Sequence, residues 1–182
     1  MSGGLRLVWM DLEMTGLDPE RCAILEIGVI VTGADLAPLA EIERVIWQPP
    51  DVLERMDPFV RQMHTDNGLL DRVRASTVSL ERAERDVFTT IQKHCGPQTG
   101  ILSGSSIHTD RTFIARYMPL VERYLHYRHV DVSTLKTLAG AWYPEAPPFE
   151  KPGANHTALA DLRESIRELA HYRDRFFVQG TK

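Results

Sequence analysis

The sequence predicts an α/β protein whose mixed sheet opens with antiparallel strands, ends in a parallel edge and is covered by helices. Three observations support this class. The first third of the chain holds three apolar segments rich in valine, isoleucine and leucine, a helical pattern then runs over residues 80–95, and short apolar segments alternate with helical ones in the remainder. Strands joined by tight turns pair antiparallel, whereas strands separated by helices pair in parallel beneath those helices.

The opening strands are expected over residues 5–13, 23–32 and 39–48. Turn residues separate them, with Gly16 after the first strand and Gly33 after the second. Glycine interrupts regular structure because it adopts backbone conformations that other residues avoid. The three segments therefore predict an antiparallel three-strand unit.

The second half of the chain alternates between the two kinds of element. Ser79 is a favoured N-cap for the helix predicted over 80–95. Short strands are expected at 101–103 and 129–132, each followed by a helix. Asn155 is the expected N-cap of the last long helix. Such alternation predicts a parallel edge to the sheet.

Length and composition predict one domain spanning residues 1–182. A chain of 182 residues, 43% of them apolar, buries about 70% of its unfolded surface. The chain lacks an apolar run of the roughly 18 residues that a membrane helix needs and a secretory signal pattern, so we expect a cytoplasmic protein. Cys22 and Cys95 lack metal-binding or disulfide spacing and are expected to be reduced.

Two acids close the first predicted strand. Side chains alternate between the faces of a strand, so Asp11 and Glu13 share one face while Leu12 points to the other. Two neighbouring carboxylates repel unless a cation lies between them, and oxygen ligands suit Mg²⁺ or Mn²⁺. The pattern is compatible with half of a metal site or with a solvated strand edge.

Three further residues complete the candidate site. Asp110 follows the short strand at 101–103, and Asp161 lies early in the last helix, five residues after His156. At roughly 100° per residue, a separation of five places two side chains about 140° apart, so they flank one helix face. The alternatives are helix-start acids favoured by the macrodipole and an exposed histidine. The residues leading into His156, 145–153, include three prolines and are expected to be irregular.

This set resembles the DEDDh signature of the DnaQ-like 3′-to-5′ exonucleases, with Asp11-x-Glu13, Asp110, and His156 five residues before Asp161. The surrounding words, at residues 9–18, 126–136 and 163–173, are similar to those of the oligoribonuclease family, and the resemblance runs from about residue 7 to residue 177. It implies an RNase H-like fold and a 3′-to-5′ exoribonuclease. Such an enzyme degrades short oligoribonucleotides, down to dinucleotides, to nucleoside 5′-monophosphates.

The resemblance also implies the roles of the site residues. Asp11, Glu13 and Asp161 would bind one divalent cation, Asp11 would help to hold a second, and Asp110 would reach that second ion directly or through water. The two ions would be Mg²⁺ or Mn²⁺. His156 would act as the general base, because its ordinary pKa is near 6.5.

Family positions further suggest a substrate-binding set. Leu17 and Phe59 would wedge the bases, His64 would lie near the substrate, and Tyr127 would reach the active site of a partner subunit in a homodimer. The far phosphate of the substrate would meet Ser106, Arg128, Ser133 and Thr137. The alternatives are core positions for Leu17 and Phe59, a half-exposed His64, a helix cap at Ser106 and an ordinary interface role for Tyr127.

Two positions depart from the family pattern. Phe59 stands where tryptophan is usual, which predicts weaker base stacking. Ser105 stands where asparagine is usual, and serine is too short to bridge two backbone groups, so the local loop geometry is open.

The charge balance ranks the possible substrates. The 21 basic and 25 acidic residues give a net charge of −4, whereas proteins that grip long nucleic acids tend to be basic. Within the exonuclease hypothesis this favours short single-stranded RNA, of two to five nucleotides, as the partner. Two alternatives remain: a proofreading or tRNA-trimming exonuclease that acts on longer substrates, and a catalytically silent binding module.

Overall fold

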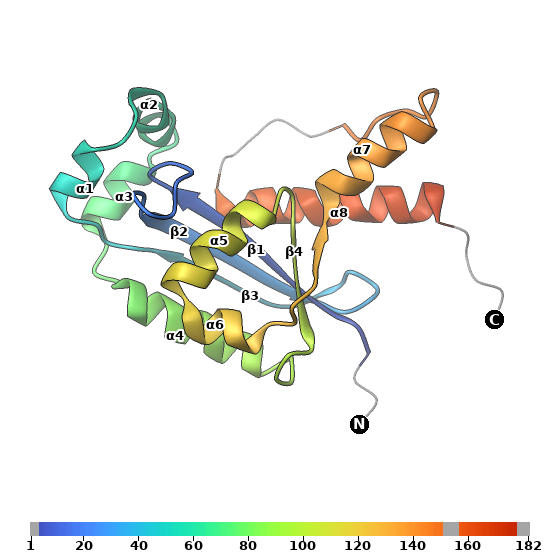
Figure 1. Cartoon of the computed structure of the whole chain (residues 1–182), viewed down its shortest axis with the longest axis horizontal. Coiled ribbons are helices and arrows are strands. Elements are labelled where there is room, and N and C mark those ends of the chain that lie inside the picture. Colours follow the sequence, from blue (N-terminus) through green and yellow to red (C-terminus); the bar gives the residue numbers. More distant parts are fainter. Residues whose placement is uncertain (1–3, 151–156, 178–182) are drawn as a thin grey trace.

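A computed structural model describes residues 4–150 and 157–177 and confirms the predicted α/β class (Figure 1). A five-stranded sheet has the order β3-β2-β1-β4-β5. The strands are β1 (Arg6–Met14), β2 (Ile24–Thr32), β3 (Pro38–Val45), β4 (Gly100–Gly104) and β5 (His129–Asp131). The helices are α1 (Pro50–Glu54), α2 (Pro58–Asp66), α3 (Leu69–Ala75), α4 (Leu80–Gln92), α5 (His108–Tyr117), α6 (Pro119–Tyr124), α7 (Val132–Trp142) and α8 (Ala158–Phe176).

The strand pairing follows the predicted mixed pattern. β1 and β2 pair antiparallel, as do β2 and β3, so the three-strand opening is confirmed. β1 pairs in parallel with β4, and β4 pairs in parallel with β5. The mixed sheet therefore places the carboxyl ends of β1, β4 and β5 along one edge, where the loops that follow them meet.

Helices cover both faces of the sheet, and β1 alternates between the two cores. Its residues Val8, Met10 and Leu12 belong to the apolar cluster packed by α4, α5 and α6. Leu7 and Trp9 belong to the cluster that α7 and α8 cover on the opposite face (Figure 1). Side chains at odd positions of β1 therefore point toward α8. Asp11 and Glu13 continue this odd series, as the sequence predicts.

Close backbone contact seats the start of α8 on the sheet. A Cβ atom at Gly28 would lie 2.9 Å from the Cβ of Ala158 and 3.0 Å from its carbonyl carbon. Only glycine permits this approach without a shift of the helix. Because Gly28 pairs with Asp11 across the sheet, the contact holds the first turn of α8 beside the acids of β1.

Several predicted boundaries are wrong, among them the end of β3, which lies at Val45 and not at residue 48. The N-cap of α8 is Thr157, whose hydroxyl accepts a hydrogen bond from the Ala160 amide at 3.3 Å, and not Asn155. Threonine caps helices for the same reason as asparagine, so the two candidates were equivalent in sequence. Helix α4 ends at Gln92 and β5 ends at Asp131, each earlier than expected, whereas Ser79 caps α4 as predicted. Asn155 and His156 lie outside the described residues.

No helix in the described part of the chain has the length and apolarity needed to cross a membrane.

Candidate active site

Three acids from two elements meet at the end of β1. Asp11 and Glu13 project from the strand, and Asp161 comes from the first turn of α8. One carboxylate oxygen from each of the three lies within 4.8 Å of the other two. Residues separated by about 150 positions in sequence thus form one oxygen-rich group. This donor set fits a divalent cation such as Mg²⁺ or Mn²⁺.

The electrostatics of the group favour the binding of a cation. Burial, together with the charges of Asp110 and Glu13, raises the pKa of Asp11 well above its ordinary value. Burial and the carboxylates of Asp161 and Glu26 raise the pKa of Glu13 to about 7. Each carboxylate therefore resists ionisation in the presence of the others, and a bound cation relieves that repulsion.

Asp110 reaches the same strand from the opposite helical layer. It lies in the first turn of α5, and its Oδ1 accepts a hydrogen bond from the Leu12 amide at 3.0 Å. Burial raises the pKa of Asp110 to about 7, although this hydrogen bond lowers it. Asp110 stands outside the close group of three acids, but its charge acts on Asp11 more strongly than that of any other carboxylate. The four acids thus form one electrostatic unit.

Sequence reasoning missed a further acid, Glu26. It is fully buried on β2 directly opposite Glu13, and its Oε1 accepts a hydrogen bond from Arg72 at 2.5 Å. Its Oε2 lies 3.4 Å from the Ala158 amide at the start of α8. Glu26 therefore links α3, β2 and α8 behind the acid group. A charged residue within the apolar run of 24–32 was the available signal.

His64 is fully buried, so the alternative of a half-exposed histidine is wrong. Its Nε2 donates to the Met14 carbonyl at 2.9 Å, because a carbonyl oxygen can only accept. Its Nδ1 lies 3.9 Å from Glu13 Oε2 and has no hydrogen-bond partner within the described ranges. Burial lowers the pKa of His64, which favours the neutral ring. A lone pair on Nδ1 then faces the acid group.

Leu17 and Phe59 are not core residues. Their exposed fractions are 76% and 77%, respectively. Leu17 lies in the turn after β1. Phe59 is the second residue of α2, and its amide donates to the side chain of the N-cap Asp57 at 2.8 Å. Two large apolar side chains in contact with water on segments next to the acid group are suited to meet planar ligands.

A network of hydroxyls lies where β4 and β5 end. Oδ1 of Asp131 accepts hydrogen bonds from the amide of Ser106 at 2.9 Å and from the amide and hydroxyl of Ser133 at 2.9 and 2.6 Å. Ser106 has a φ of 53°, and its hydroxyl lies 3.1 Å from that of Ser133. Thr137 donates to the Ser133 carbonyl at 2.9 Å. Ser106 is not the cap of α5, so that alternative is wrong.

The remaining predicted residues lie in the loop between α6 and β5. Tyr127 is 73% exposed, and the Arg128 guanidinium carbon lies 5.4 Å from its ring centroid.

Ser105, the second departure from the family pattern, places its hydroxyl 3.0 Å from that of Ser165 on α8. This contact joins the loop after β4 to α8.

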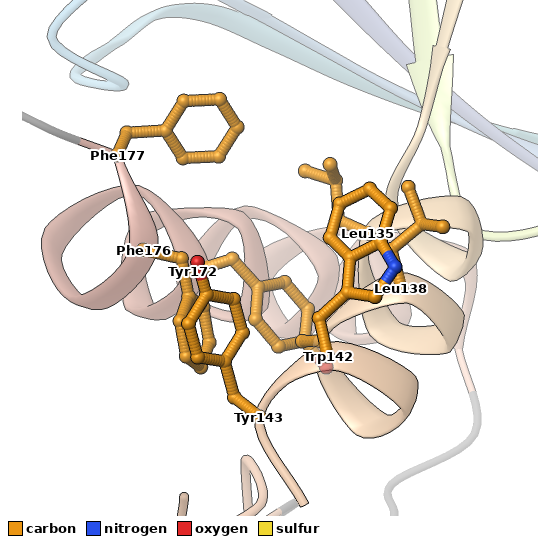
Figure 2. Close-up of a pocket in the computed structure, with 8 residues that line it drawn as sticks. Leu135, Leu138, Trp142, Tyr143, Tyr172, Phe176 and Phe177 are labelled. Atoms are coloured by element: carbon orange, nitrogen blue, oxygen red, sulfur yellow. The ribbon is translucent and has the colours of Figure 1, made fainter.

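An apolar pocket, separate from the acid group, lies between α7 and α8. Figure 2 shows the ring of Tyr143 against that of Phe176, with ring centroids 4.6 Å apart. Trp142 and Phe177 also line this pocket and are 66% and 56% exposed. Its lining is mainly aromatic and aliphatic, with the Tyr143 and Tyr172 hydroxyls and the Trp142 indole as its polar side-chain groups. It offers no carboxylate for the binding of a cation.

Comparison with known proteins decides the family. A family model described as an exonuclease matches residues 8–169. A curated oligoribonuclease of Marinobacter nauticus is 46% identical over 97% of this chain and 99% of its own length. The chain belongs to the oligoribonuclease family. An oligoribonuclease of Pseudomonas paraeruginosa is 47% identical over 97% of the chain and 98% of its own length. The chain is therefore a metal-dependent exonuclease.

Solved structures support the fold. An exonuclease I from Methylocaldum szegediense has a TM-score of 0.69 at 20% identity, over 94% of this chain and 41% of that one. An Escherichia coli exonuclease I in complex with an oligonucleotide has a TM-score of 0.72 at 14% identity, over 95% and 41%. The chain spans about two fifths of these longer proteins. The RNase H-like exonuclease fold expected from the sequence is confirmed.

Proposed function

We propose that this enzyme hydrolyses short single-stranded RNA, of two to five nucleotides, from the 3′ end and releases nucleoside 5′-monophosphates. The observation that carries the proposal is the group formed by Asp11, Glu13 and Asp161, each of which places one carboxylate oxygen within 4.8 Å of the other two. The similarity to oligoribonucleases over nearly the whole chain supports the substrate class.

Two divalent cations, Mg²⁺ or Mn²⁺, are the proposed cofactors. Asp11, Glu13 and Asp161 would hold one, Asp11 would share the second, and Asp110 would reach that second ion directly or through water. When bound, the ions neutralise charge on the attacking and leaving oxygens and acidify the attacking water. Asp110 fixes its own carboxylate to the backbone between the two β1 acids, through the Leu12 amide.

His156 is the proposed acceptor of the proton from the attacking water. Since His156 lies outside the described residues, the family signature alone supports this role. A group with a pKa near 6.5 accepts a proton readily at neutral pH.

Three side chains are proposed to recognise the 3′ nucleotides. Leu17 and Phe59 would sandwich the bases, since stacking is worth about 1 to 3 kcal/mol per base and is independent of sequence. His64 would accept a hydrogen bond from a ribose hydroxyl at Nδ1. The Nδ1 lone pair faces the Glu13 carboxylate, so two hydrogen-bond acceptors repel each other. A hydroxyl group would supply the donor that Nδ1 needs.

The hydroxyl network is proposed to bind the 5′ phosphate and so to limit substrate length. Ser133 donates its hydroxyl proton to Asp131, and Thr137 donates to a backbone carbonyl. The hydroxyl of Ser106 and the guanidinium of Arg128 are therefore the proposed direct donors, while Ser133 and Thr137 shape the pocket. The net charge of −4 suits a substrate with few phosphates.

We further propose a cytoplasmic homodimer of one exonuclease domain, residues 1–182. Tyr127 would reach the active site of the partner subunit from its exposed loop.

The test is the rate of hydrolysis of 5′-labelled RNA of two, three, five, seven and twenty nucleotides with Mn²⁺, run beside Asp110→Ala. We expect the dinucleotide to be cleaved fastest, the rate to fall with length, and the variant to be inactive. Equal rates for the dinucleotide and the twenty-mer would contradict the length limit and favour an exonuclease of longer substrates. Inactivity on every length would favour a silent binding module.

A further inference from the structure

Arg111, on α5 next to Asp110, has every donor of its guanidinium in use within the protein. Nη1 donates to the carbonyls of Tyr127 at 3.0 Å and Arg128 at 3.4 Å, and Nη2 donates to the carbonyl of His126 at 3.2 Å. Nε and Nη2 also donate to Glu122 Oε1 at 3.2 and 2.9 Å. A guanidinium has five N–H groups, and these five contacts account for all of them.

The three carbonyls belong to consecutive residues of the loop that follows α6. Their side chains include Tyr127, which is 73% exposed, and Arg128, whose guanidinium lies over the tyrosine ring. The loop has few other backbone anchors: the His126 amide donates to the Gly100 carbonyl at 2.8 Å, and the Arg128 amide donates to its own loop at His126 Nδ1. Arg111 therefore supplies the main hydrogen bonds between the backbone carbonyls of this loop and the rest of the protein.

The charge of Arg111 is already compensated. The Arg111 side chain is 17% exposed and its guanidinium pairs with Glu122, so it is not available to a phosphate. Lysine could not replace it, because an ammonium has three donors on one atom and cannot reach four acceptors placed around a planar fork.

We infer that Arg111 is a positioning residue, which holds the loop 126–128 so that Arg128 is presented to the 5′ phosphate of the substrate. This inference rests on the proposed function of that loop. The same turn of α5 thus serves both ends of the substrate: Asp110 contacts β1 at the acid group, and Arg111 anchors the loop at the phosphate end.

The test compares Arg111→Lys with Arg82→Lys as a matched control. Arg82 forms an exposed ion pair with Asp86 on α4, far from the site in sequence and 66% exposed. Two readouts are needed: hydrogen exchange of the amides of 126–131, followed by mass spectrometry, and the KM and kcat for a dinucleotide with and without its 5′ phosphate.

We expect Arg111→Lys to speed exchange in the loop but not in β1, and to raise the KM for the 5′-phosphorylated dinucleotide by about tenfold or more. The kcat should change by less than about threefold, and the KM for the unphosphorylated dinucleotide should be unaffected. Arg82→Lys should change none of these quantities.

Two results would overturn the inference. Unchanged exchange in the loop would show that Arg111 does not restrain it, whatever the activity. Faster exchange with an equal rise in KM for both dinucleotides would show a general structural role. Failure of the proposed function would be seen in the wild-type enzyme, which would then not cleave the phosphorylated dinucleotide. The exchange measurement does not depend on activity, so it would still decide whether Arg111 restrains the loop.

Discussion

The carboxylates at the end of β1 and the carboxylate of Asp131 stand in opposite electrostatic states. Burial and mutual repulsion raise the pKa of Asp11 and bring that of Glu13 to about 7. Burial would also raise the pKa of Asp131, but hydrogen bonds from Ser133 and Ser106 hold it below its ordinary value. A carboxylate at the end of β1 therefore favours the binding of a cation, whereas the carboxylate of Asp131 is stabilised by N–H and O–H donors. Surroundings, and not residue type, separate a candidate metal ligand from a structural acid.

The largest effect is expected from Asp11→Asn. The change removes a proposed shared ligand, so activity should fall by about a thousandfold or more. The metal-free protein should remain folded, because the change also removes a source of repulsion. Steady-state rates and circular dichroism with thermal melting would check both points. Near-normal activity in this variant would remove the acid group from the mechanism.

Asp131→Asn should produce a smaller and different effect. An amide oxygen accepts more weakly than a carboxylate, so the serine network should loosen at a cost of about 1 to 3 kcal/mol in the free energy of unfolding. We expect the KM for a dinucleotide to rise about tenfold with kcat within a few fold. A fall in kcat as large as that of Asp11→Asn would mean that the two carboxylates do not play different roles.

The dependence of stability on pH should separate the two sites further. Glu13 and Asp110 have folded-state pKa values of about 7, above their unfolded values, so the folded state binds more protons between about pH 4 and pH 7. This contribution to stability is present at low pH and is lost as the pH rises through that window. The melting temperature of the metal-free protein should therefore fall as the pH rises from about 4 to about 7.

Excess Mn²⁺ should restore the melting temperature at pH 7.5, because a ligand that binds only the folded state stabilises it. Melting curves with Mn²⁺ and with a chelator would measure the difference. If the two curves coincide at every pH, the raised pKa values have no connection with cation binding.

The smallest effects are expected at two glycines, of which Gly28 seats α8 beside the acid group and Gly140 has no close neighbour. Gly28→Ala would press a Cβ against Ala158 and Leu159, and should cost about 1 to 3 kcal/mol in the free energy of unfolding while lowering activity through a shift of α8. Gly140→Ala, inside α7 with nothing within 4 Å of the added atom, should stabilise by about 0.5 to 1 kcal/mol. Denaturant titrations would show whether the two changes differ in sign, as the close approach at Gly28 requires.

A region could be predicted from the sequence where its contacts join residues close together in the chain, and could not where they join distant residues. Two-residue alternation placed Asp11 and Glu13 on one face, because strand periodicity is local. The mixed antiparallel and parallel pairing followed from the order of strands and helices along the chain. The family pattern supplied Asp161, Ser106 and Ser133 as candidates, and contacts across the fold bring each to its place.

Residues whose importance arises only in three dimensions escaped prediction. In the sequence, Glu26 is a single charge in an apolar strand, and only the fold shows that it contacts Arg72 and the start of α8. Asp131 is the last residue of the short strand β5, and its hydrogen bonds likewise appear only in the fold. From the sequence, the region 50–75 was not divided into its three helices, α1, α2 and α3, each of which has nine residues or fewer. Short helices depend on packing more than on intrinsic propensity, so local sequence carries little of their signal.

Helix α2 carries both Phe59, exposed near its start, and His64, buried near its end and bonded to the last residue of β1. Five residues of helix separate them, a rise of about 7.5 Å. The spacing between the proposed base-stacking ring and the acids is therefore set by a rigid rod and one hydrogen bond. An insertion in the loop before α2 should leave that spacing unchanged, whereas one added residue within the helix should rotate the ring by about 100° away from its position.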